Sequence, residues 1–162
     1  MITAYKWTYD MANMTYGEAV PTLYWISPNG YNATGDGTNL LPWKTLSYAC
    51  SQVTNIGAVI HVAPGTYTET AQSVLAPGVS IEGIGDTCII TSAAALNPII
   101  TASSAAGNAA NGNQSISYLK LDGDLTALRS IDANFRSNVK IHHCTFVDFL
   151  YNGVRMNGTV SN

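Results

Sequence analysis

The chain has 162 residues, of which 7 are Lys or Arg and 10 are Asp or Glu, and its formal net charge is −3 at pH 7. These basic residues are few and scattered, which argues against nucleic acid as a partner, because phosphate recognition needs a clustered basic surface. Charged residues make up only 10% of the chain, which disfavours both disorder and a helical bundle with a surface rich in Glu and Lys.

Two parts are predicted along the chain: an N-terminal arm over residues 1–22 and a domain over residues 23–162. The arm is rich in Tyr and Met and contains no apolar signal core. In the domain, "YWIS" predicts a short strand and "PNGYNATGDGTN" a long turn. "PWKTLSYACSQV" predicts a helix over about 42–53, with Pro42 in or near its first turn. Its apolar face comprises Trp43, Leu46, Ala49, Cys50 and Val53.

Residues 57–162 predict short strands separated by turns, in about four coils of similar pattern, and the low-complexity stretch 103–114 predicts a loop. The aligned pairs are Ile60 with Val79, Ile81 with Ile116, Ile116 with Ile141, and Ile131 with Met156, the last two with a shift of 25 residues. A strand-rich repeat of this length with variable loops is typical of a stacked β-solenoid. The residues expected to share its core include Ile60, Val62, Val79, Ile81, Ile116, Ile141 and Cys144.

The stretch over residues 24–84 also resembles a known family. "YWISPNGYNATGDGTNLLPWKTLSYACSQV", "GAVIHVAPGTYTE" and "GVSIEGIG" resemble the opening of right-handed parallel β-helix proteins of the pectate-lyase-like superfamily. The resemblance implies an all-β fold, a right-handed parallel β-helix with an N-terminal arm and one capping helix, in which "VAPGTYTE" is a corner of the first coil. Because lyases, hydrolases, adhesins and phage tailspikes share this scaffold, the resemblance implies no single function.

Candidate catalytic residues follow from the same resemblance. A lyase of this superfamily uses a Lys or Arg base, with Asp and Glu holding Ca²⁺ against the uronate carboxylate. The candidates are Lys120, Asp122, Asp124, His142 and Arg155, with Arg129 and Lys140 nearby. A solenoid needs polar residues on its solvent side in any case, and Val147 takes the position of Asp122 on the next coil. No catalytic residue is therefore assigned, and Ca²⁺ is expected only if the chain is a lyase.

Binding sites for other ligands have separate candidates. The tyrosines that we expect to stack on sugar rings are Tyr31, Tyr118 and Tyr151. The residues that faintly match a calcium loop are Asn29, Asn32 and Asp36, but the loop lacks acidic density, and no cofactor is expected. His142 and His143 are adjacent, so a regular strand would turn them to opposite sides, and they could share a metal only if a bulge turned one of them.

Two functions remain open. The first is a non-catalytic structural or glycan-facing module of an extracellular surface or virion assembly, similar to a tailspike or fibre. The alternative is the N-terminal part of a polysaccharide lyase or glycoside hydrolase acting on acidic polysaccharide. "NGTVSN" ends within a coil, so we expect a protein partner, a second copy or further coils to cover this end. No apolar run reaches the length of a membrane span, and no membrane insertion is expected.

Overall fold

The computed structural model describes residues 21–104 and 110–157, so the predicted N-terminal arm lies outside the described part up to residue 20. Strands dominate the described part, which has one short helix. The elements in chain order are β1 (Leu23–Ile26), α1 (Leu46–Gln52), β2 (Val59–Val62), β3 (Gly65–Glu69), β4 (Ser73–Val74), β5 (Ser80–Ser92), β6 (Ile100–Thr101), β7 (Ala110–Asp122), β8 (Arg129–Asn134), β9 (Arg136–His142), β10 (Thr145–Val147) and β11 (Asn152–Asn157).

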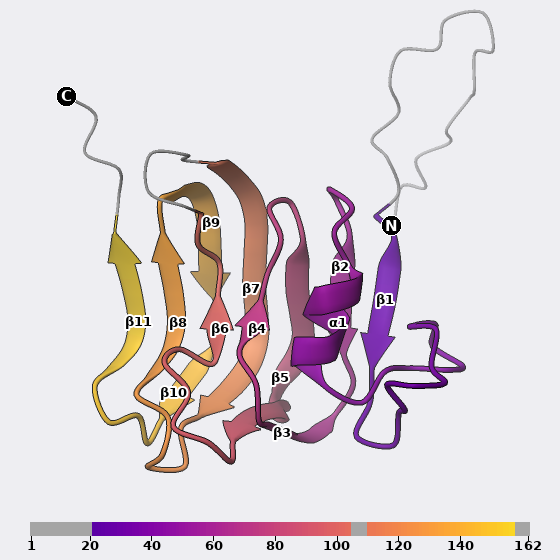
Figure 1. Cartoon of the computed structure of the whole chain (residues 1–162), viewed down its shortest axis with the longest axis horizontal. Helices are drawn as coiled ribbons and strands as arrows, with labels where there is room; N and C mark the ends of the chain where they lie inside the picture. Colours follow the sequence, from indigo (N-terminus) through magenta and orange to yellow (C-terminus); the bar gives the residue numbers. More distant parts are fainter. Residues whose placement is uncertain (1–20, 105–109, 158–162) are drawn as a thin grey trace, which may run out of the picture.

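The strands form two sheets, and within each sheet every pair of neighbouring strands is parallel. The larger sheet has the order β1-β2-β5-β7-β10, with β3 on β5 and β9 on β7, and the smaller sheet has the order β11-β8-β6-β4. The chain crosses repeatedly from one sheet to the other, because β4, β6 and β8 each fall between strands of the larger sheet in the sequence. Figure 1 shows the strands side by side, from β1 at one end to β11 at the other. From β2 onward, each passage of the chain therefore adds one layer to both sheets.

One column of aligned side chains runs through the larger sheet. In this column Ile60 pairs with Ile81, Ile81 with Ile116, and Ile116 with Ile141. The last two pairings confirm the alignment made from the sequence. The expected pairing of Ile60 with Val79 is wrong by two residues, and Ile131 pairs with Val154 instead of Met156. A slip of two residues preserves the side to which a strand residue points, so the apolar alternation could not detect either error.

The core lies between the two sheets and contains most of the residues expected there. Five of the seven are fully buried, namely Ile60, Val62, Val79, Ile81 and Ile116. The other two, Ile141 and Cys144, are only partly buried and pack against the edge of the core. They belong to the last layer, formed by β9, β10 and β11, which has a neighbouring layer on one side only among the described residues.

Helix α1 lies within the predicted range but is shorter than expected. Thr45 is its N-cap, and the Thr45 side chain accepts the backbone N–H of Tyr48. Pro42 and Trp43 therefore precede the helix, which corrects their predicted place in it, and Trp43 instead forms a parallel bridge with Ile26. Leu46, Ala49 and Cys50 are buried as expected. Figure 1 shows α1 next to β4, beyond the end of the smaller sheet and near β1.

The predicted loop over residues 103–114 is wrong in its last part, since β7 begins at Ala110, while residues 105–109 lie outside the described part. Small polar residues can enter the strand because their backbone pairs with β9, with Ala110 opposite Arg136. Gln114 is buried, and its amide donates to the carbonyl oxygen of Val79 at 3.1 Å. The backbone hydrogen bonds to β9 and the buried Gln114 side chain therefore stabilise this part of β7, which has no apolar alternation.

Candidate functional site

A cluster of three rings lies on the outside of the larger sheet, where β7 bends and β9 ends. The rings of Tyr118 and His143 are stacked, with centroids 4.7 Å apart and an interplanar angle of 15°. The ring of His142 stands nearly perpendicular to both, at 5.8 Å from Tyr118 and 5.1 Å from His143. Nδ1 of His142 lies 2.9 Å from Nδ1 of His143. We call Tyr118, His142 and His143 the ring cluster.

The backbone explains why adjacent histidines meet. His143 has a φ of 52° and Tyr118 a φ of 56°, in the left-handed region that is uncommon for residues other than Gly. A left-handed residue interrupts the alternation of sides, so His143 turns its ring toward that of His142. The two rings therefore meet through a local irregularity of the kind that the sequence analysis left open, and not through regular strand geometry.

The apolar alternation of the sequence does not indicate His143 as a partner of Tyr118. A signal for it was present, because His143 follows Tyr118 by the same 25 residues that separate Ile116 and Ile141. Residues at one position of successive layers become neighbours when the layers pair in register. The repeat itself could therefore have placed these two rings together.

Two of the candidate catalytic residues form an ion pair near the ring cluster. Nζ of Lys120 lies 3.3 Å from Oδ2 of Asp122, and both side chains point outward with less than a third of their surface exposed. Asp122 pairs with Thr91 on one side and, as expected from the sequence, with Val147 on the other. Asp124 is exposed in the turn after β7, and its backbone N–H donates to Oδ1 of Asp122 at 3.0 Å.

Arg155 does not join these residues. It lies on β11 in the smaller sheet, where Nε donates to Oδ1 of Asp132 at 3.0 Å and Nη2 contacts Oδ2. Asp132 is buried, so the guanidinium neutralises a carboxylate held away from water. The five candidate catalytic residues thus do not make one cluster, because the larger sheet carries some of them and the smaller sheet carries Arg155.

The three candidate tyrosines also lie apart. Tyr118 belongs to the ring cluster, whereas Tyr151 precedes β11 with the guanidinium carbon of Arg129 5.9 Å from its ring centre. Tyr31 is strongly exposed and borders a shallow hollow of about 240 Å³ near the first layer, which Asn29 and Lys44 also line. No two of the three tyrosines therefore share one site.

The candidate calcium loop uses its oxygens internally. Oδ1 of Asn32 accepts the backbone N–H groups of Lys44 at 2.8 Å and Thr45 at 3.2 Å. Oδ1 of Asp36 accepts the N–H of Thr38 at 2.9 Å, and this hydrogen bond holds the pKa of the Asp36 carboxyl below its ordinary value. In residues 21–104 and 110–157, no three His, Cys, Asp or Glu side chains come together as a metal site.

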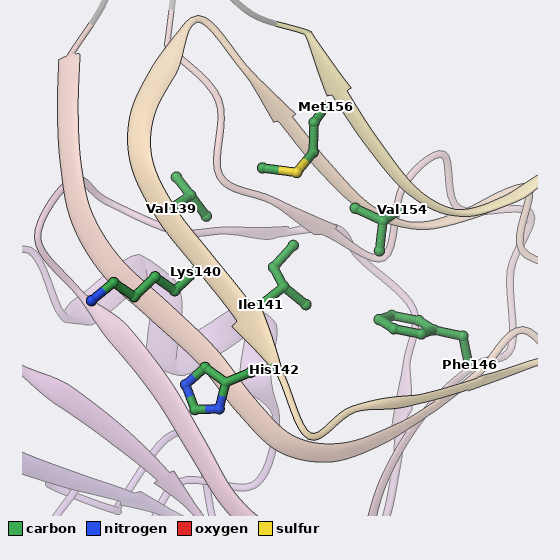
Figure 2. Close-up of a pocket in the computed structure, with 7 residues that line it drawn as sticks. All are labelled: Val139, Lys140, Ile141, His142, Phe146, Val154 and Met156. Carbon is green, nitrogen blue, oxygen red and sulfur yellow. The ribbon is translucent and has the colours of Figure 1, made fainter.

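The last layer ends in an apolar hollow of about 660 Å³, which we call the end hollow. The residues that line it are Val139, Lys140, Ile141, His142, Phe146, Val154 and Met156. Figure 2 shows Ile141, Val154 and Phe146 directed toward it, whereas Lys140 and His142 point away on the other side of β9. Among the residues that the structure describes, the end hollow is therefore the uncovered end of the core, and His142 faces the outer surface.

Comparisons with known proteins add no relative: no family model, no curated protein and no solved structure matches the chain. Among the helices of the described part, none has the length and apolar character needed to cross a membrane.

Proposed function

We propose that the chain is a right-handed parallel β-helix that serves as a non-catalytic, glycan-facing structural module of an extracellular surface or virion assembly. The parallel pairing of successive layers and the repeated crossing between two sheets support the β-helix. The right hand is supported by a general rule, since connections between parallel strands of one sheet are right-handed in almost every protein.

One column of outward side chains carries the non-catalytic part of the proposal. At successive layers of the larger sheet this column contains Thr68, Thr91, Asp122 and Val147. Glycoside hydrolysis needs two carboxyl groups facing each other, and a calcium-dependent lyase needs several carboxylates around the ion. Asp122 has Thr91 and Val147 as its column neighbours, and its carboxylate contacts Lys120.

The ring cluster supports the glycan-facing part. Tyr118 keeps 37% of its surface exposed while its ring is fixed by His143 and His142. A rigid aromatic side chain offers apolar area with little loss of conformational entropy when a ligand binds. Lys140 points outward on the same side of β9 as His142, so an anionic polysaccharide fits this surface better than a cationic one (Figure 2).

The end hollow supports the assembly part. Among the described strands, β9, β10 and β11 have a neighbour on one side only, and apolar Ile141, Phe146 and Val154 lie between them. Unpaired strand edges next to apolar surface favour pairing with a further layer of strands. We therefore propose that a protein partner supplies such strands at this end.

Met156→Lys tests this partner, because it puts a charge into the end hollow. Light scattering of the native assembly should show weaker association in this variant than in the wild type.

Two assays on the isolated chain test the proposal. Incubation with pectate, alginate or chondroitin should release no unsaturated product, followed by the absorbance of the new double bond. In gels that contain pectate or alginate, the chain should be retarded, and Tyr118→Ala should reduce the retardation while the matched variant Tyr151→Ala should not. If product forms and Lys120→Ala abolishes it, the alternative of a polysaccharide lyase replaces the structural module. Equal retardation of both tyrosine variants would remove the glycan-facing role from the ring cluster.

A further inference from the structure

We propose that His142 and His143 form a chelating site for a divalent first-row transition metal ion, of which Cu²⁺ is the best fit. The two residues lie where β9 ends, on the outer surface of the larger sheet. Their Nδ1 atoms face each other at 2.9 Å. The proposal does not depend on glycan binding or on the assembly.

The distance between the two nitrogens is that of a hydrogen bond, and it also fits two adjacent ligands of one metal ion. Imidazole nitrogens bind such ions at about 2.0–2.1 Å, so two ligands at a right angle around one ion lie about 2.9 Å apart. A tetrahedral ion would hold them farther apart, at about 3.3 Å by the same geometry. Square-planar or tetragonal coordination by nitrogen is typical of Cu²⁺ and Ni²⁺, and Cu²⁺ binds most tightly in the divalent series.

The site is held in this geometry without a ligand. His143 keeps its left-handed backbone, which costs about 1–3 kcal/mol for a residue of this kind and persists only where the surroundings enforce it. The surroundings here include Tyr118, whose ring stacks on His143 at 4.7 Å and meets His142 edge-on at 5.8 Å. A metal ion would therefore find both imidazoles already turned toward each other, with little entropy left to lose on binding.

The neighbouring side chains leave the other coordination positions open. Sγ of Cys144 is directed inward, at 3.4 Å from the carbonyl oxygen of His142 and 3.6 Å from that of Ile116. No third His, Cys, Asp or Glu of the described residues joins the pair, so water or an oxygen of a bound molecule would complete the coordination.

Titration with Cu²⁺ alone, followed by electron paramagnetic resonance, tests the site in the full chain. The wild-type spectrum should show hyperfine splitting from two nitrogen ligands at one equivalent of Cu²⁺. His142→Asn and His143→Asn should each lose one nitrogen and weaken binding by at least about tenfold, because the second ligand of a chelate acts at a high effective concentration. Asn suits position 143 because it tolerates a left-handed φ, so the backbone is retained.

The third histidine of the chain provides the matched control. His61 packs on Trp25, with ring centres 4.1 Å apart, and belongs to β2 in an earlier layer. His61→Asn should leave the affinity and the nitrogen count unchanged. Equal Cu²⁺ affinity of the wild type and both site variants, or the same loss in His61→Asn, would overturn the proposal and leave a hydrogen-bonded pair of histidines. Circular dichroism of each variant checks that its fold is intact.

Discussion

The carboxylate of Glu69 accepts the backbone N–H of Leu46 at 2.8 Å. Its second oxygen accepts the N–H of Ser47 at 3.0 Å, and the Glu69 side chain is fully buried. The carboxylate of the last residue of β3 therefore lies at the N-terminus of α1, where unpaired N–H groups and the helix dipole favour a negative charge. This contact explains how "VAPGTYTE" joins the first layer of strands to the helix.

Glu69→Ala should lower the free energy of unfolding by about 2–4 kcal/mol, because two N–H groups lose a charged acceptor in a site closed to water. Glu69→Gln should lose about half as much, since one amide oxygen can still accept one of these hydrogen bonds. Urea unfolding followed by circular dichroism measures both. A loss below about 0.5 kcal/mol in Glu69→Ala, the usual range for surface changes, would show that the contact contributes little.

Ile81→Ala and Ile141→Ala should separate the centre of the core from its end. Ile81 is fully buried between Ile60 and Ile116, so its truncation should cost about 2–5 kcal/mol. Ile141 is only partly buried at the end hollow, so its truncation should cost about half of that. Urea unfolding of the two variants provides the comparison, and equal losses would contradict the order of layers.

Asn138→Ala should destabilise the chain by about 1 kcal/mol more than Asn138→Gly, because Asn138 has a φ of 53° and a Cβ is unfavourable there. Both variants lose the hydrogen bond from Nδ2 of Asn138 to Oδ1 of Asn113 at 2.9 Å. Gly adopts the left-handed backbone without strain, so the difference between the variants isolates the backbone term. Thermal unfolding of the pair measures it, and a more stable Ala variant would exclude this conformation.

Arg155→Ala should reduce stability by about 2–3 kcal/mol, because it leaves the carboxylate of Asp132 buried without its partner. Adding Asp132→Leu should recover part of the loss, since an apolar side chain needs no counter-charge. A cycle of the two single variants and the double variant gives the coupling energy by urea unfolding.

The Arg155→Ala variant should be retarded in pectate gels as strongly as the wild type. A weaker retardation of Arg155→Ala would show that Arg155 contacts the glycan.

The chain should lose stability as the pH rises above about 9–10, where thiols and phenols ionise in the unfolded state. Burial raises the pKa of Cys50 and of Tyr67, whose hydroxyl donates to the carbonyl oxygens of Ala63 at 2.7 Å and Ile26 at 3.0 Å. Their folded pKa values exceed the unfolded ones, so this stability is present at lower pH and lost as the pH rises.

Tyr67→Phe tests the tyrosine part of this alkaline loss. The variant should start about 1 kcal/mol less stable at neutral pH, because its hydrogen bond is gone. Above pH 10 its stability should fall less steeply, by up to about 1.4 kcal/mol per pH unit for the one group removed. Urea unfolding at a series of pH values gives both slopes. Parallel slopes of Tyr67→Phe and wild type would show that Tyr67 does not titrate differently on folding.

Much of the layered arrangement was readable in the sequence. The alternation around Ile81, Ile116 and Ile141 predicted their pairing, because a strand with one buried face repeats every two residues. The helix was predicted from its apolar face, although it begins at Leu46, after the N-cap Thr45, and leaves Pro42 outside. The register of Ile60 was not readable, since a slip of two residues keeps every side chain on its own face and loops of any length are tolerated between layers.

The sequence by itself determined that the chain builds short strands around an apolar core, because composition and alternation act locally. Only the tertiary structure decided which polar residues meet. His143 reaches His142 through a left-handed backbone, and Glu69 reaches Leu46 across 23 residues of chain. The tertiary structure also places Arg155 on the smaller sheet, apart from Lys120 on the larger sheet. Contacts of this kind depend on the exact path of the backbone between layers, and no periodic pattern of side chains records that path.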